Sequence, residues 1–519
     1  MILGAVTLKE QQATFQIDVK NSEITVWGLF MYADHPAGKE SVDAFWADFS
    51  QNRANFDACT GVYRVEIKCN DGRRIYFCDN SGCARYYIDE KRAAFSTTLM
   101  AALPREERVP NYGAISQFLY FGCIYGFDTP VEGVTVSDPA KYYVVELGQL
   151  TVVDKGLTPL EELPGQEQAL HTQMHRFARA AADIEKVACT ITGGTDSRAI
   201  LAHLLNEGLH PVLNITGHDG QADVDIACKI AELTGLELMA VSDEPDDENW
   251  INDAIEAADG MNGVCGIYRL YKKARLLHDN GIPLECGGAA GELYKNSFIN
   301  QDLPFYGGSP RWERFVRYKV ATYDYPQSLC GEKIAEEMQK IPALMLEWVS
   351  RHGGKNKANA YLNAGYEIMQ SRVCGVYSMS TRWYTHYNPL LERNVAALAL
   401  KKNPYKLEMQ AYQREQVSLY YPDIKSVETD RGLTCDSNRK LQEFMKSNLF
   451  LVKVAAERVF RRGNASQRID PCFAQGLSSE QFRTALERCK EFGIVPEGIS
   501  KEQIPQGIAD RLFAIGTLL

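Results

Sequence analysis

The chain has 519 residues, 45% of them hydrophobic and 24% charged, and a formal net charge of −11. Its length exceeds what one hydrophobic core usually holds, so two or three domains are expected. The acidic balance argues against an extended nucleic-acid surface, and no apolar run is long enough to cross a membrane, so we expect neither a nucleic-acid nor a membrane partner.

The first residues, MILGAVTLKEQQ, have neither a basic n-region nor a long apolar h-region. This pattern predicts a cytoplasmic protein without a secretory signal. In that compartment the 14 cysteines are expected to be free thiols, many of them in the core.

Residues 1–155 have the composition of a β-rich domain. Four runs of β-branched and aromatic residues, separated by turn residues such as Asn70-Asp71-Gly72, predict strands: TVWGLFMY, GVYRVEIKC, RRIYFCD and KYYVVEL. The polar stretch 155–168, which contains two prolines, is expected to be a linker.

Residues 168–519 form the second expected domain. Three apolar runs predict strands: KVACTIT (186–192), PVLNIT (211–216) and LELMAVS (236–242). The two segments between them have a helical period, with apolar positions at Ile200, Leu201, Leu204 and Leu205, and at Val224, Ala227, Cys228 and Ala231. Gly208 and Gly235 are the candidate helix ends. Alternating strands and helices predict a parallel sheet with helices on its faces, and beyond about residue 250 the pattern is mostly helical.

The stretch CTITGGTDSRAILAHLL (189–205) places glycines, hydroxyls and an acid between the first of these strands and its helix. Gly193 and Gly194 allow close approach of a ligand to the backbone, and the helix start offers N–H groups and a positive dipole end, as phosphate sites do. The hydroxyls of this site are Thr192, Thr195 and Ser197. Asp196 suits such an anion site when it meets a cation, and Mg²⁺ carried by ATP phosphates is the natural one.

A plain strand-to-helix turn is the alternative, with glycines used for packing and Asp196 or Ser197 as the N-cap. The stretch matches neither the Walker loop nor the GxGxxG dinucleotide fingerprint.

The stretch resembles the SGGxDS pyrophosphate loop of the ATP pyrophosphatases, with Thr192 where that family usually has Ser. Four further passages resemble asparagine synthetase in order and spacing. Residues 59–99 and 115–145 are similar to its class II glutamine amidotransferase domain and to the passage that joins it to the synthetase domain, and ECGGAAGELYKNSF (285–298) is similar to its second ATP-site loop. YNPLLERNVAALAL (387–400) is similar to its "PFLD" segment.

The resemblance implies a multidomain α/β protein. Residues 1–155 would be a β-rich, Ntn-hydrolase-like (αββα) domain, and residues 168–519 a doubly wound parallel-sheet ATP pyrophosphatase domain with extra helices. It also implies ATP contacts at Ile215 and Thr216, mainly through backbone atoms, and at Gly287 and Gly288.

The first domain departs from a working glutaminase. The family's nucleophile is Cys at position 2, where this chain has Ile2, and the Asp of its "LDG" motif is replaced by Thr60. The first cysteine of the chain is Cys59. Because a thiol must attack the glutamine amide, we expect no glutamine hydrolysis. In this respect the domain resembles the silent N-terminal domains of β-lactam synthetases and lasso-peptide cyclases.

The second ATP-site loop also departs from the family, which has roughly S-G-E-G-S-D-E there. The first Glu, the expected base for the amine, is Gly288 in this chain, and the Asp is Gly291, so Glu292 is the remaining acid. Tight backbone packing is the alternative for the small residues, and a helix-start carboxylate without chemistry is the alternative for Glu292.

Further candidates follow from position. Arg198 directly follows Ser197 and could bind a phosphate or an acceptor carboxylate, or could be a solvated helix-start residue. Acceptor-lining candidates are Arg382, His386 and Tyr387, and downstream cation candidates are Lys406, Lys425 and Arg431, for each of which surface solvation is the alternative.

The resemblance implies an AMP- and pyrophosphate-forming amide-bond synthase with ATP and Mg²⁺ as cofactors. Its catalytic residues would be Glu292 and Arg198, and Asp196 would meet Mg²⁺ through the ATP phosphates. Its partners would be a small-molecule or peptide carboxylate and an amine, and a homodimer is left open. A specialised-metabolite cyclase and a degenerate nucleotide-binding protein are the alternative functions.

Overall fold

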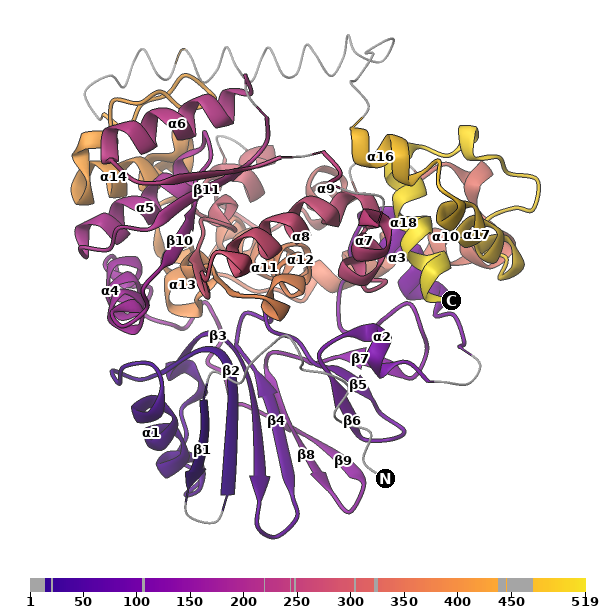
Figure 1. Ribbon diagram of the computed structural model, residues 1–519, viewed down its shortest axis with the longest axis horizontal. Helices are drawn as coiled ribbons and strands as arrows, with labels where there is room; N and C mark the ends of the chain where they lie inside the picture. Colours follow the sequence, from indigo (N-terminus) through magenta and orange to yellow (C-terminus); the bar gives the residue numbers. More distant parts are fainter. Residues whose placement is uncertain are drawn as a thin grey trace.

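The computed structural model describes residues 15–19, 22–104, 108–218, 220–242, 244–246, 249–302, 305–321, 325–436, 445 and 470–519. Ile2 and the side chain of Lys406 lie outside this description. The protein is mixed α/β, with two antiparallel sheets, one parallel sheet and many helices (Figure 1).

The larger antiparallel sheet has the order β1-β2-β3-β4-β8-β9. Its strands are β1 (Phe15–Val19), β2 (Ser22–Tyr32), β3 (Cys59–Cys69), β4 (Arg74–Cys78), β8 (Lys141–Glu146) and β9 (Gln149–Asp154). The four predicted runs fall on β2, β3, β4 and β8. The predicted turn joins β3 to β4, and Gly72 adopts a φ of 91° there, a conformation that glycine adopts without steric cost.

Side chains of β2 are buried on both faces of this sheet. Even-numbered residues such as Phe30 join an aromatic cluster under helix α1 (Lys39–Phe49), where the rings of Phe30 and Tyr63 meet edge to face at 4.7 Å. Odd-numbered residues such as Leu29 and Met31 face the main core. The sheet therefore rests with one face on the rest of the molecule.

A smaller antiparallel sheet, in the order β6-β5-β7, lies beside it. Its strands are β5 (Tyr87–Asp89), β6 (Ala94–Ser96) and β7 (Val134–Val136), and the nearby helices are α2 (Leu99–Ala102) and α3 (Tyr112–Phe121).

The parallel sheet has the order β12-β11-β10-β13-β14. Its strands are β10 (Val187–Thr190), β11 (Val212–Thr216), β12 (Leu238–Val241), β13 (Leu284–Cys286) and β14 (Thr385–Tyr387). The helices between the first strands are α5 (Thr195–Asn206) and α6 (Ala222–Thr234). In α6 the predicted apolar face is confirmed at Val224, Ala227 and Ala231, but Cys228 is exposed. Gly235 ends α6 in a left-handed conformation, as predicted.

The other helices within the described ranges surround the parallel sheet and extend from it (Figure 1). They are α4 (Ala169–Ala181), α7 (Trp250–Ala258), α8 (Val264–Asp279), α9 (Trp312–Phe315), α10 (Glu332–Ser350), α11 (Lys357–Met369), α12 (Gly375–Tyr377), α13 (Arg393–Lys401), α14 (Ala411–Tyr420), α16 (Pro471–Gly476), α17 (Glu480–Glu491) and α18 (Gln506–Leu518). Among the described residues, no helix is both long and apolar enough to cross a membrane.

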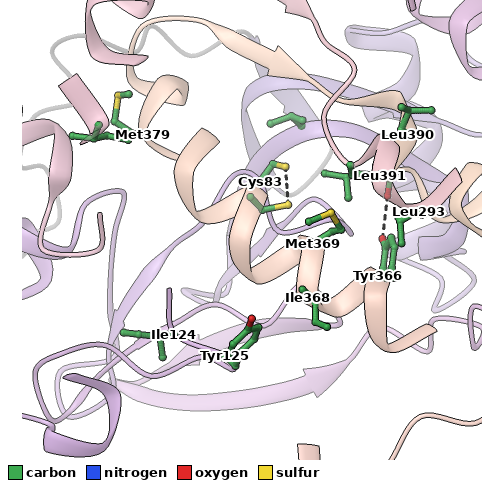
Figure 2. Packing of buried hydrophobic residues seen from close by; sticks show 14 of the residues in the cluster. Cys83, Ile124, Tyr125, Leu293, Tyr366, Ile368, Met369, Met379, Leu390 and Leu391 are labelled. Carbon is green, nitrogen blue, oxygen red and sulfur yellow. Dashed lines mark hydrogen bonds between the residues drawn. The ribbon is translucent and has the colours of Figure 1, made fainter. Parts of the chain in front are cut away.

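The antiparallel and parallel parts share a buried contact zone, part of which Figure 2 shows. The thiols of Cys83 and Cys374 lie 3.0 Å apart in it, and both side chains are buried. The backbone N–H of Gly61 on β3 donates to the carboxyl of Glu392 at 2.7 Å, at the start of α13. Residues 155–168 between the two parts contain no helix or strand. Buried Lys155 at the beginning of that stretch donates to three oxygen atoms of the antiparallel part.

Candidate functional site

The parallel sheet has a topological switch point between β10 and β13. From β10 the chain continues to β11 on one side, and β13 later pairs with the other side of β10. In open α/β sheets, ligands bind at the carboxyl ends of the strands at such a point. The TGGTDS stretch follows β10 and the CGGAAGE stretch follows β13, so both predicted loops lie at this position.

The loop after β10 is held by its own hydroxyls. The backbone N–H of Thr192 donates to the Ser197 hydroxyl at 3.0 Å, and the two side-chain hydroxyls lie 3.1 Å apart. Gly194 precedes the first residue of α5, Thr195, and no side chain caps this helix start. The first-turn N–H groups and the positive end of the helix dipole are therefore available to an anion.

Two contacts from elsewhere in the chain fix this loop. The Gly193 N–H donates to the Asp223 carboxylate at 3.1 Å, and a Cβ at Gly193 would come within 2.3 Å of that carboxylate. The Thr195 hydroxyl donates to the Gln410 side chain at 2.6 Å. A side chain at 193 would therefore displace the Asp223 carboxylate from the loop. The sequence offered no signal for Asp223 or Gln410.

The loop after β13 packs directly on the first turn of α5. A Cβ at Gly288 would lie 2.6 Å from the carbonyl carbon of Asp196 and from the nitrogen of Ser197. Gly287 is buried against the His386 ring. Glu292, in the short helix η2 (Gly291–Tyr294), is exposed. The structure therefore brings the two loops together and leaves one carboxylate at their rim.

The Asp196 side chain has two nitrogen partners. Lys295 Nζ lies 2.5 Å from one carboxylate oxygen, and the Gln413 side chain donates to the other at 2.9 Å. Burial raises the pKa of Asp196, while the Lys295 ammonium acts against that rise. Lys295 and Gln413 were not predicted from the sequence.

This arrangement does not fit a metal ion bound by Asp196. Both carboxylate oxygens already accept from N–H donors, whereas Mg²⁺ needs oxygen ligands in near-octahedral geometry. Within the described residues, no group of three or more His, Cys, Asp or Glu could hold a metal.

Arg198 is fully buried and points away from solvent. Its guanidinium donates to the backbone carbonyls of Val427 at 2.6 Å, Glu428 at 2.9 Å and Gly193 at 3.1 Å. Arg198 is therefore not the solvated helix-start residue of the alternative, and its contact with a ligand stays a prediction. Arg198 instead ties the segment around residue 427 to the loop after β10.

The other predicted site residues differ in burial and in their contacts. Ile215 is buried in the core, and Thr216 at the end of β11 is half-buried. Arg382 pairs with Asp259 at 3.5 Å and Tyr387 is fully buried, so neither faces an open acceptor pocket. The downstream cations differ in exposure: Lys425 is half-buried and Arg431 is exposed.

A buried charge network lies beneath the loop after β13. The Glu285 carboxylate, on β13 itself, bonds to Lys273 at 3.0 Å, to the Tyr384 hydroxyl at 2.8 Å and to the His386 ring. Burial alone would raise the pKa of Glu285, but Lys273 and His386 hold it well below its usual range. His386 therefore packs beneath the loop after β13 and bonds to Glu285. The sequence indicated it only through its place near the "PFLD"-like segment.

Two cavities of the described part lie outside these loops. One of about 940 Å³ lies between α6 and residues 426–429, and one of about 610 Å³ lies between the antiparallel part and helices α10 and α11. Neither is lined by a residue of the two loops. Gly288 lies against the first turn of α5, and Lys295 pairs with Asp196 in that turn.

No family model matches the chain, and no curated protein matches it.

Proposed function

We propose that the chain is an ATP-dependent, AMP- and pyrophosphate-forming amide-bond synthase with an ATP pyrophosphatase-type parallel-sheet domain. The observation that carries the proposal is the contact between Gly288 and the Asp196–Ser197 peptide. It puts two glycine-rich loops together at the switch point of the sheet, beside a helix start that no side chain caps.

The phosphate groups of ATP would bind the first-turn N–H groups of α5, with the hydroxyls of Thr192 and Ser197 beside them. Gly193 and Gly194 supply the close backbone approach. A carboxylate oxygen of the acceptor then attacks the α-phosphorus, and the bond to pyrophosphate breaks. The products of this step are an acyl adenylate and pyrophosphate.

An amine nitrogen next attacks the acyl carbon and AMP leaves, which forms the amide. The attacking nitrogen must lose a proton. Glu292 is the acid that the second loop offers for this task, since Gly288 and Gly291 carry no side chain. Its exposed position at the rim suits contact with an incoming acceptor. The enzyme contributes positioning and charge stabilisation.

We propose that the antiparallel part, an Ntn-hydrolase-like domain, does not supply ammonia from glutamine. Residue 2 is Ile. The first cysteine, Cys59, is buried, and burial raises the pKa of its thiol to about 12, so it is a poor nucleophile. The amine is therefore ammonia itself or a group of a larger substrate.

A nucleotide-binding protein without chemistry is the second candidate. It is favoured by the Asp196–Lys295 ion pair and by Gly288 and Gly291, which leave a single carboxylate on the loop.

Release of AMP and pyrophosphate from ATP separates these functions. The assay would compare aspartate with ammonia, glutamine, and an extract of the source organism, with Asp196→Ala as the inactive control. AMP formation that needs one acceptor and disappears in the variant supports the synthase. ATP binding without AMP formation on any acceptor supports the second candidate.

A further inference from the structure

The Asp196 carboxylate is enclosed on three sides. Lys295 Nζ meets one oxygen at 2.5 Å and Gln413 meets the other at 2.9 Å. The backbone of Gly291 covers the third side, where a Cβ would lie 2.1 Å from Asp196 Cγ. Gln413 also donates to the Gly291 carbonyl at 3.1 Å and so holds these groups together.

The groups around Asp196 do not suit a hydrated divalent ion, because nitrogen donors and the Gly291 backbone already lie against its carboxylate. Mg²⁺ keeps several waters and binds oxygens at about 2.0–2.1 Å in an octahedron. The space beside Asp196 that such an ion would need holds the Lys295 ammonium and the Gly291 backbone. A side-chain carboxylate at position 291 could help to hold a divalent ion, and this chain has none there.

Lys295 comes from the same loop as Gly288 and Glu292, directly after η2. Its side chain is only 15% exposed, and that of Asp196 is 18% exposed. The pair is therefore partly desolvated, so water screens the charge of the Lys295 ammonium less than it screens that of an exposed lysine. A lysine chain is flexible, so its ammonium can turn toward a phosphate while Gln413 retains Asp196.

We propose, on the premise of the function proposed above, that the Lys295 ammonium is the resident cation of the pyrophosphate site and takes the place of a metal ion at Asp196. The ligand class is the polyphosphate group of a nucleotide. Its binding at the start of α5 then needs Lys295 and does not need a divalent metal.

Titration calorimetry with the ATP analogue that has a methylene group between the α- and β-phosphorus tests this proposal, since the analogue cannot release pyrophosphate. The wild-type protein is titrated with EDTA and with Mg²⁺. We expect the dissociation constants measured with EDTA and with Mg²⁺ to agree within about threefold. Inorganic pyrophosphate serves as the second probe.

Lys295→Met is the test variant. With EDTA it should bind the analogue at least about tenfold more weakly than the wild type, and Lys295→Arg should keep metal-free binding. Lys91→Met makes the same charge change at an exposed turn of the antiparallel part and should leave both constants unchanged. Thermal melting of each variant shows that it is folded.

The outcomes separate the two proposals. The role of Lys295 is overturned if the wild-type protein binds the analogue only with Mg²⁺. It is also overturned if Lys295→Met binds the analogue in EDTA as tightly as the wild type does. Either result leaves the proposed function standing. Absence of binding under both conditions overturns both.

Discussion

Gly288, in the loop after β13, lies against the peptide bond between Asp196 and Ser197 in the first turn of α5. A Cβ at this position would come within 2.6 Å of backbone atoms. Two segments about ninety residues apart in the chain thereby form one surface at the carboxyl edge of the parallel sheet.

Gly288→Ala should disrupt that surface. The added methyl group cannot fit without displacing the backbone of α5, so nucleotide affinity should fall by at least about tenfold and stability by about 1–3 kcal/mol. The matched control is Gly307→Ala, because a Cβ there meets no atom within 4 Å. Equal nucleotide affinity in the two variants would refute the contact.

Ser197→Ala should loosen the loop after β10. The change removes the acceptor of the Thr192 N–H and the hydroxyl contact at 3.1 Å. Chemical denaturation should show a loss of about 1–2 kcal/mol, with weaker nucleotide binding. Ser350→Ala, on the exposed side of α10, removes a hydroxyl that bonds only within its own helix turn and should change neither quantity. A nucleotide affinity like that of the wild type would show that the hydroxyl pair does not shape the site.

Glu392 should make stability depend on pH. Burial raises its pKa to about 8 in the folded protein, whereas the pKa of a Glu in the unfolded chain is about 4.3. The folded state therefore holds the proton over the range in which the unfolded state has lost it. Its contribution to stability is present below the unfolded pKa and decreases as the pH rises toward about 8.

Glu392→Gln removes this titration and keeps an acceptor for the Gly61 N–H. The variant should gain melting temperature relative to the wild type as the pH rises from about 5 to about 8, and the gain should level off above that. Melting curves of the two proteins at matched pH values measure it. A difference that is constant with pH would contradict the buried neutral acid.

The thiols of Cys83 and Cys374 should resist modification in the folded protein. Both side chains are buried, and their sulfur atoms lie 3.0 Å apart. Figure 2 shows the surroundings of Cys83. The contact with Cys374 and burial hold the pKa of the Cys83 thiol well above its usual range. With an aromatic disulfide reagent and peptide mass mapping, exposed Cys228 should react quickly, and the buried pair only after unfolding. Simultaneous modification of all three would mean that the antiparallel part does not pack on the helices as described.

Much of the element order could be predicted from the sequence. The long runs that became β2, β3, β10 and β11 have clear patterns, and Gly235 marks a helix end. Strands β13 and β14 were missed, because each has only three residues and is too short to show a periodicity. Without β13 the sheet has no topological switch point beside β10, so the position of the site could not be predicted.

The site could be predicted only in its local parts. The glycines and hydroxyls of the loop after β10 are contiguous and could be recognised. The partners of Asp196 lie 99 and 217 residues away along the chain, so no local pattern could reveal them. The surroundings of Arg198 could not be predicted for a related reason. A helix-start arginine is usually solvated, but here the segment around Val427 covers it, and carbonyls of that segment accept hydrogen bonds from its guanidinium.

The central claim is that the loops after β10 and β13 form one nucleotide site. Hydrogen exchange with and without the methylene ATP analogue tests it most directly, because it reports each segment separately. The account predicts slower exchange at both 191–198 and 287–292, with the antiparallel sheet unchanged. Protection of neither loop, or of one loop alone, would contradict it.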